Sequence, residues 1–537
     1  MRPRTLLVLL GLVLACAAFI QFYERKLPSS TERTARAKKV LELDKDQVRG
    51  VTIAAGPTEV RLERVSPGAG QGPGASDQAG QGPGASDKTA EKSAPPAAEK
   101  APSEIEWRIV KPIAARADTA AVDRLLEALA GLEKTRTMEK VSPAAVGLDR
   151  PQAVVRLATL DPKTRRGGET VLQLGAEVPT GGSLIAAIAG KPEAYVVSDS
   201  ILGDLRKPPG DWRDRRIFHG DRDRIERIAL AAGGGPKVLL ARRGDRFWIE
   251  SPIADRADRD QVEKLLTDLT GLSAERFVDG PAPPAGQLGL DPPRAVVEAV
   301  LARQAQPLRI ELGASHPGPP QGAPPAGENA ASPDPPDSGA GSPPSLLTYA
   351  RASGTLFETR TPLAEAAARP PSSWRSPSLS GLEVHQIDAA TVRGAGAPPI
   401  TLTRSGTDWK RNAATISYLP VSDLLFAVTD AKADRLLAPD EARALAAALA
   451  RPPLLAFELK AGAAGNETLT LYPPLAAPAG KAAPGDTPAT ARVPARASGR
   501  DVVLLLPESK LKDIQDKLAA VRTAAPLAPE KKPGKGK

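Results

Sequence analysis

Residues 107–118 read Trp-Arg-Ile-Val-Lys-Pro-Ile-Ala-Ala-Arg-Ala-Asp, and residues 247–258 repeat this pattern as Phe-Trp-Ile-Glu-Ser-Pro-Ile-Ala-Asp-Arg-Ala-Asp. The apolar positions of the next fifteen or so residues recur at the same offset. A Gly-Leu-Asp turn then follows in both copies, at residues 147–149 and 289–291. A series of matches in the same order along the chain predicts that a single folded unit is duplicated.

A third, more diverged copy is expected near the C-terminal end. Trp409 precedes apolar residues at helical spacing, and Leu-Thr-Leu at 469–471 corresponds to Leu-Gln-Leu at 172–174. This copy lacks both the Gly-Leu-Asp turn and the Ala-Asp pair. All five tryptophans are expected at repeat-equivalent positions, three before the helix and two at the junctions: Trp107, Trp248, Trp409, Trp212 and Trp374.

Each copy is predicted to contain several strands and at least one helix. Short stretches with alternating apolar and polar residues, such as 48–53 and 153–158, indicate strands. Asp118 and Asp258 are good N-caps for helices whose apolar residues follow at i, i+3, i+4 and i+7. The predicted fold class is therefore α+β: tandem modules, each a mostly antiparallel β-sheet with an amphipathic helix packed on it, after one N-terminal transmembrane helix.

Segments rich in Gly, Pro and Ala interrupt each copy. Since they separate predicted strands, we interpret them as disordered inserts within folded modules. The predicted organisation is a membrane anchor at 1–26, module 1 at 38–210 with an insert at 66–103, module 2 at 211–372 with an insert at 314–345, module 3 at 373–522 with an insert at 473–499, and a disordered Lys/Pro tail at 523–537.

The N-terminal segment is predicted to be an uncleaved membrane anchor. Residues 6–20 carry no charge and, with the next three residues, reach the length of a short membrane-spanning helix. Two alternatives stay open: a lipoprotein signal ending at Cys16, and a cleaved signal peptide. The charges that flank the segment favour a cytoplasmic body, but long domains are exported largely regardless of charge, so we expect a single-pass inner-membrane protein with its bulk in the periplasm.

Composition argues against several functional classes. A single cysteine excludes an intramolecular disulfide, and three scattered histidines leave little material for a metal site. The net charge of +9 comes from 72 basic and 63 acidic residues that are interleaved, which indicates a solvated surface rather than a nucleic-acid-binding track. We therefore expect a protein that is not an enzyme, has no cofactor and does not bind nucleic acid.

Five residues are candidates for a binding role. Trp107, Trp248 and Trp409 could stack on sugars in a row, and Asp149 and Asp291 could line equivalent sites on successive modules. The structural alternative for each is a packed core tryptophan or an aspartate that bonds to its own turn.

These motifs, together with the short N-terminal span ending in Phe-Tyr-Glu-Arg-Lys at 22–26, resemble the DUF4340 domain-containing family of bacterial membrane-anchored repeat proteins. The resemblance implies an association with ABC transporters of the gliding-motility type. The expected function is thus a non-catalytic periplasmic scaffold or accessory subunit, with the inner membrane and a transporter permease or related envelope protein as partners. The alternative is a repeat protein that binds cell-envelope polysaccharide or peptidoglycan.

Overall fold

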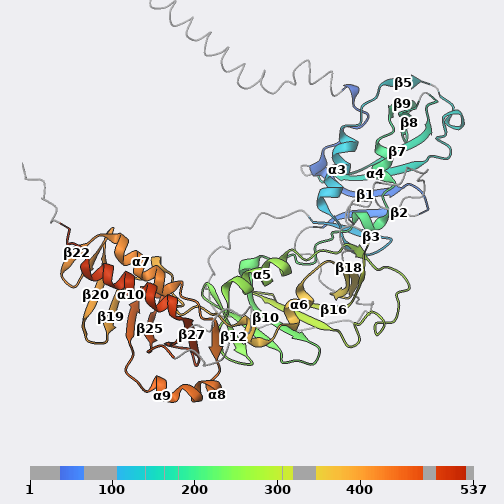
Figure 1. The fold of residues 1–537 in the computed structure, drawn as a ribbon. Coiled ribbons are helices and arrows are strands. Elements are labelled where there is room, and N and C mark those ends of the chain that lie inside the picture. Colours follow the sequence, from blue (N-terminus) through green and yellow to red (C-terminus); the bar gives the residue numbers. More distant parts are fainter. Residues whose placement is uncertain are drawn as a thin grey trace, which may run out of the picture. The chain divides into compact units, whose positions relative to one another are not determined.

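The computed structural model describes residues 37–57, 59–65, 106–139, 141–161, 164–179, 181–304, 306–318, 346–475 and 491–527 (Figure 1). The chain divides into two compact units, Met1–Arg215 and Arg216–Lys537. The predicted anchor at 1–26 lies outside the described residues. Among the residues that are described, none of the helices has both the length and the apolar character that crossing a bilayer requires.

The first unit contains one nine-stranded antiparallel sheet in the order β4-β3-β2-β1-β6-β7-β8-β9-β5. Its strands are β1 (Val48–Ala54), β2 (Glu59–Val65), β3 (Glu106–Lys111), β4 (Ala115–Arg116), β5 (Arg136–Glu139), β6 (Ala153–Leu160), β7 (Gly167–Glu177), β8 (Ser183–Ile188) and β9 (Glu193–Ser198). Its helices are α3 (Thr119–Ala130) and α4 (Ile201–Leu205), with short 3-10 turns η2 (Lys45–Gln47), η3 (Pro143–Val146) and η4 (Pro209–Trp212).

The second unit contains two more sheets with the same strand order, β13-β12-β11-β10-β15-β16-β17-β18-β14 and β22-β21-β20-β19-β24-β25-β26-β27-β23. We call them sheet 2 and sheet 3. The strands of sheet 2 are β10 (Ile225–Ala232), β11 (Val238–Arg243), β12 (Arg246–Ser251), β13 (Asp255–Arg256), β14 (Arg276–Phe277), β15 (Ala295–Leu301), β16 (Leu308–Pro317), β17 (Leu346–Ala352) and β18 (Thr355–Thr359). Its helices are α5 (Arg259–Thr270) and α6 (Leu363–Ala368), with 3-10 turns η5 (Arg222–Arg224) and η6 (Pro371–Trp374).

Sheet 3 repeats this plan with more helix at its far edge and C-terminus. Its strands are β19 (Ala389–Gly394), β20 (Ala397–Ser405), β21 (Asp408–Arg411), β22 (Ala414–Ile416), β23 (Arg435–Leu437), β24 (Leu455–Lys460), β25 (Asn466–Leu471), β26 (Arg492–Ala497) and β27 (Val503–Pro507). Its helices are α7 (Tyr418–Thr429), α8 (Pro439–Ala442), α9 (Ala446–Leu449) and α10 (Glu508–Thr523), with 3-10 turns η7 (Val384–Gln386), η8 (Arg443–Leu445) and η9 (Gly462–Ala464).

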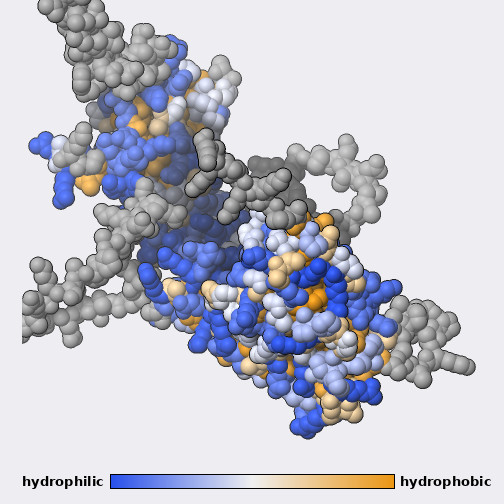
Figure 2. All heavy atoms as spheres, turned by 90° about the vertical axis from the view of Figure 1, so that its left-hand side faces the viewer, coloured by the Kyte–Doolittle hydropathy of each residue, from blue (hydrophilic) through white to orange (hydrophobic). Residues whose placement is uncertain are grey.

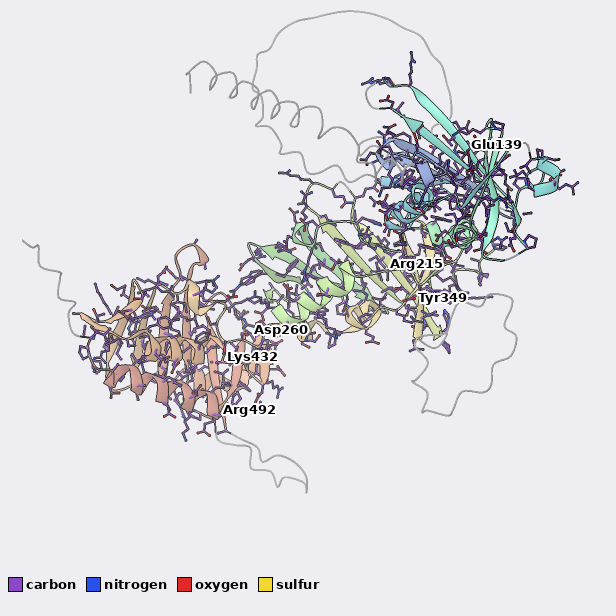
Figure 3. The ribbon with its side chains drawn as sticks, turned by 90° about the horizontal axis from the view of Figure 1, so that it is seen from above. Glu139, Arg215, Asp260, Tyr349, Lys432 and Arg492 are labelled. Atoms are coloured by element: carbon purple, nitrogen blue, oxygen red, sulfur yellow. The ribbon has the colours of Figure 1, made fainter. Side chains whose placement is uncertain are left out.

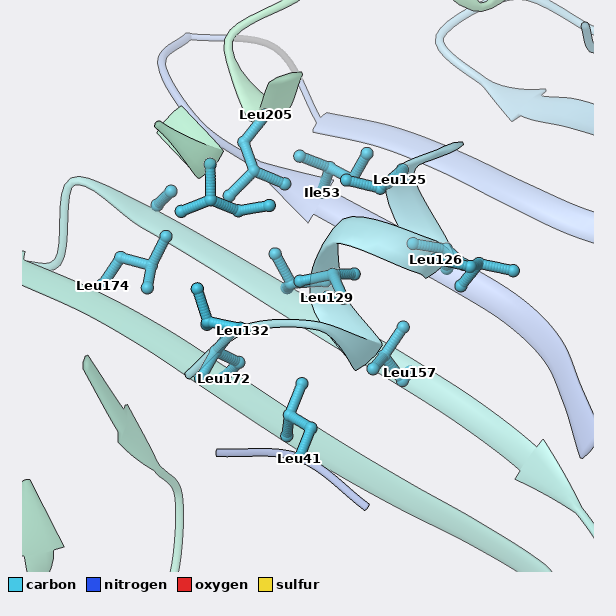
Figure 4. Close-up of a cluster of buried hydrophobic side chains, with 14 of the residues drawn as sticks. Leu41, Ile53, Leu125, Leu126, Leu129, Leu132, Leu157, Leu172, Leu174 and Leu205 are labelled. Carbon is cyan, nitrogen blue, oxygen red and sulfur yellow. The ribbon is translucent and has the colours of Figure 1, made fainter. Parts of the chain in front are cut away.

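At least one helix packs on the core face of each sheet, as predicted. In the first unit the Asp118 carboxylate accepts hydrogen bonds from the amides of Ala120 and Ala121, which fixes the start of α3. Leucines of α3 then lie against leucines of β6 and β7 (Figure 4). Burying each such side chain contributes about 1.5–3 kcal/mol, so this face of the helix largely determines where it lies.

The fold class differs from the prediction in its proportions. The described residues form three nine-stranded antiparallel sheets with few helices, so the predicted antiparallel sheets are present and the architecture is mostly β rather than α+β. The edge strands, such as β4 and β13, are only two residues long. A strand of two residues is too short to show alternating apolar and polar positions. The sequence pattern therefore reveals fewer strands than the sheet contains.

The predicted boundaries of two inserts differ from those in the structure. β16 continues to Pro317, so residues 314–317 of the predicted insert 314–345 are strand. β26 occupies Arg492–Ala497, inside the predicted insert 473–499. Both strands contain Ala and Pro and lie next to Pro/Ala/Gly-rich sequence, which made their ends look like linker.

The Gly-Leu-Asp turn packs against the glycine that follows Leu-x-Leu within β7 and β16. A Cβ added to Gly175 would lie 2.4 Å from the Val146 carbonyl oxygen, and one added to Gly313 would lie 2.1 Å from the Leu288 carbonyl oxygen. Real Cβ atoms do not approach backbone so closely, so both copies require glycine here. The role of the Gly-Leu-Asp turn and of the glycine after Leu-x-Leu is therefore to pack the turn closely against the strand.

We expect Gly175→Ala to lower the free energy of unfolding of the first unit by about 1–3 kcal/mol, because the backbone of the turn must move. Gly203→Ala is the matched control: Gly203 lies in α4 with no atom within 4 Å of its added Cβ. The control should be neutral or stabilise by up to about 1 kcal/mol. Urea denaturation of both variants checks this, and equal midpoints for the two would contradict it.

Candidate functional site

Five charged side chains are buried where sheets 2 and 3 meet within the second unit: Asp255, Arg256, Arg375, Glu467 and Arg500. We call them the junction cluster. They come from β13 at the edge of sheet 2, the linker after η6, the start of β25 and the turn between β26 and β27. Charges are almost never buried unless they are paired, so this arrangement requires a specific geometry.

Asp255 lies at the centre of the junction cluster. Its Oδ2 accepts hydrogen bonds from Arg375 Nε at 2.8 Å and from Arg500 Nη2 at 3.1 Å. Its Oδ1 accepts from Arg500 Nε at 2.8 Å and from the Arg256 amide at 2.8 Å. The two-point contact with Arg500 is the geometry in which guanidinium and carboxylate pair most strongly.

Arg500 also holds the linker between the two sheets. Its Nη1 donates to the Ser378 carbonyl at 2.9 Å, and its Nη2 donates to the Ser376 carbonyl at 2.8 Å. One side chain of sheet 3 therefore binds both the edge strand of sheet 2 and the chain that connects the sheets.

Glu467 makes the second half of the junction cluster. Its carboxylate pairs with Arg256 Nη2 and accepts hydrogen bonds from Ser380 Oγ at 2.6 Å and from the Gly381 amide at 3.0 Å. A Cβ at Gly381 would lie 2.5 Å from Arg256 Nη1, so a glycine is needed beside the buried guanidinium.

Burial and ion pairing shift the pKa of Asp255 in opposite directions. Burial alone would raise its pKa, but the hydrogen bonds and charges of Arg500 and Arg375 outweigh it, so the pKa of Asp255 lies below its ordinary value. Burial lowers the pKa of Arg256. Three guanidiniums face two carboxylates, and Arg256 Nη1 and Arg375 Nη2 have no hydrogen-bond acceptor among the described residues.

A pocket of about 810 Å³ lies beside the junction cluster, between α5 and β12 of sheet 2 and α7 of sheet 3. We call it the junction pocket. Arg256 and Glu467 lie on its wall, and the ion pair between Asp260 on α5 and Lys432 after α7, at 3.4 Å, joins its two sides (Figure 3). Four aromatic side chains also line it: the buried Phe247, and the more exposed Trp248, Tyr418 and Phe426.

The three candidate tryptophans do not form a row of exposed rings. Trp107 and Trp409 are 1% and 0% exposed and belong to the cores of their sheets. Trp248 is not their equivalent: Phe247 is the buried residue at that position, and Trp248 lies on the opposite face of β12. The repeat equivalence predicted for Trp248 is therefore wrong by one residue, and in a strand one residue reverses the face.

The other sequence-based candidates lie in different settings. Trp248 is partly exposed in the junction pocket, with the Arg243 guanidinium 5.3 Å from its ring centre. Asp149 and Asp291 are exposed and do not line the junction pocket. Asp149 accepts a hydrogen bond from the next amide, at 3.0 Å, as a turn residue does. The structure thus brings one of the five candidates into the pocket.

Sequence reasoning missed the junction cluster. Asp255 stands where the first copy has Ala115, and this was the one visible signal, a carboxylate gained inside an otherwise matching motif. Its partner Arg500 is 245 residues away, so no local pattern could have connected them. Within the described residues, no group of His, Cys, Asp and Glu has the arrangement of a metal site.

The comparison with known families gives one match. Residues 107–293 match the family described as Domain of unknown function (DUF4340). The DUF4340 match begins in β3 and ends before β15, so it includes parts of the sheets of both units. No curated protein and no solved structure matches the chain.

We expect Asp255→Asn to lower the free energy of unfolding of the second unit by about 3–5 kcal/mol, because two buried guanidiniums lose their anion. Asp245→Asn is the control: Asp245 is 74% exposed and lies 3.9 Å from Arg246, so its loss should change stability by less than about 1 kcal/mol. Urea denaturation measures both. Equal stability of Asp255→Asn and the unmodified chain would contradict the account.

The stabilisation by Asp255 should depend on pH. Its folded pKa lies below the unfolded value of about 3.9, so the stabilisation is complete above that value and is lost as pH falls through the folded pKa. The difference in stability between the unmodified chain and Asp255→Asn should therefore be constant from pH 7 to 5 and smaller at pH 3. A difference that is as large at pH 3 as at pH 7 would contradict this.

Proposed function

We propose that the chain is a non-catalytic scaffold, anchored in the inner membrane with its sheets in the periplasm, and an accessory subunit of an ABC-transporter or gliding-type envelope complex. The observation that best supports the proposal is the junction cluster, because it fixes two repeated sheets relative to each other. A scaffold needs successive modules held at defined positions, and a buried ion-pair network supplies that definition.

Two further observations support the same proposal. All three sheets share one strand order, so similar surfaces recur along the chain. The DUF4340 match agrees with the resemblance from which the transporter association is drawn. The anchor rests on the uncharged N-terminal segment alone.

The polysaccharide-binding alternative has less support. A sugar-stacking row needs a ring exposed on each module, whereas Trp107 and Trp409 are buried. Trp248 is left as the one tryptophan of the five with a partly exposed ring.

Affinity purification of the tagged full chain from detergent-solubilised membranes tests the proposal. We expect a transporter permease or ATPase subunit to be enriched, and a variant without residues 1–26 to disappear from the membrane fraction. Alkaline phosphatase fused after Lys537 should be active, since the body is expected in the periplasm. An inactive fusion, or repeated purifications without any transporter subunit, would contradict the proposal.

A further inference from the structure

We propose that the junction pocket binds a basic segment of a partner protein, whose Lys or Arg side chains lie against the aromatic rings of Trp248, Tyr418 and Phe426. This inference rests on the proposed scaffold function, because it names the surface through which the scaffold would hold its partner.

Three of the aromatic residues that line the pocket, Trp248, Tyr418 and Phe426, have no aromatic counterpart in the compared elements. The helices α3, α5 and α7 each have twelve residues, so their positions correspond one to one. The first and ninth residues of α7 are Tyr418 and Phe426; the same positions are Arg259 and Thr267 in α5, and Thr119 and Glu127 in α3. Trp248, the third residue of β12, corresponds to Arg108 in β3. Aromatic residues thus replace polar ones at this junction.

These rings are exposed in spite of their apolar character. Tyr418 is 44% and Phe426 50% exposed, in a chain with only 3% aromatic residues. The face drawn in Figure 2 mixes hydrophilic residues with groups of apolar ones. Exposed apolar side chains gathered in a pocket mark a binding site more often than scattered ones do.

The charge of the pocket favours a cation. Seven carboxylates line it against five Lys and Arg side chains, although the chain as a whole has a net charge of +9. Asp430, the C-cap of α7, is exposed and has no ion-pair partner among the described residues. The corresponding caps of the other helices are Gly131 and Gly271. The C-terminal end of a helix is also the negative end of its dipole.

Aromatic faces together with negative charge are the chemistry that recognises ammonium and guanidinium groups. An acidic envelope polymer would be repelled by this pocket. Leu419, 64% exposed beside Tyr418, extends the apolar surface along α7 and has no use in stacking on a sugar. A protein segment with basic and apolar side chains matches both features, so we infer that class of partner.

Trp248 provides the assay, because Trp107, Trp212, Trp374 and Trp409 are all at most 1% exposed. The full chain is titrated with the peptide acetyl-Lys-Leu-Lys-Leu-Lys-amide while tryptophan fluorescence is followed. We expect a saturable change that weakens with added salt, and no change with the matched peptide in which Glu replaces Lys. Phe426→Thr and Asp430→Asn should each weaken binding about five-fold. Leu346→Ala, at a residue 62% exposed on β17 and outside the pocket, is the control and should bind normally.

Several results would overturn the inference. These are equal binding of the Glu peptide, a response to a neutral chitin tetrasaccharide in place of the Lys peptide, no saturable change, or normal binding by Phe426→Thr. The proposed scaffold function is tested separately. If Phe426→Thr still enriches a transporter subunit from membranes, the scaffold stands and the pocket is not its docking surface.

Discussion

The Asp255 carboxylate, surrounded by the guanidiniums of Arg375 and Arg500, is the interaction on which the second unit depends. A charge with 2% exposure is tolerated only when its partners are in place, and these partners come from the linker and from sheet 3. The same contacts that satisfy Asp255 therefore specify how the two sheets meet. A hydrophobic interface could be as stable, but it would accept many sliding arrangements that a two-point ion pair excludes.

The junction also explains why the copies differ. Sheets with one strand order need similar buried apolar positions, and these match between copies, whereas the glycine contact with the turn is shared by the first two sheets. Residues that face the junction pocket are free of that requirement, and there polar residues of the other copies give way to Trp248, Tyr418 and Phe426. The departures from the repeat thus lie together in space although they are far apart in the sequence.

Features that depend on residues close together in the sequence were predicted, and features that depend on contacts between distant residues were not. The helix after Asp118, its cap and the recurrence of both after Asp258 were predicted, because capping and apolar spacing act within a few residues. The repeat position of Trp248 was predicted wrongly by one residue, which in a strand is enough to place the ring on the opposite face. The junction cluster could not be predicted at all, because its two-point contact joins residues 255 and 500.

If the junction cluster holds sheets 2 and 3 in one arrangement, the distance between the two sheets should have a single value, and this distance can be measured. Spin labels at Lys264→Cys on α5 and Lys512→Cys on α10, both exposed, report the distance between the sheets once the single native cysteine, Cys16, is replaced by Ser. Double electron–electron resonance should give one narrow distance distribution. The distribution should become broad in the variant that also carries Asp255→Asn. A broad distribution in the presence of Asp255, or a distribution that Asp255→Asn leaves unchanged, would contradict the account.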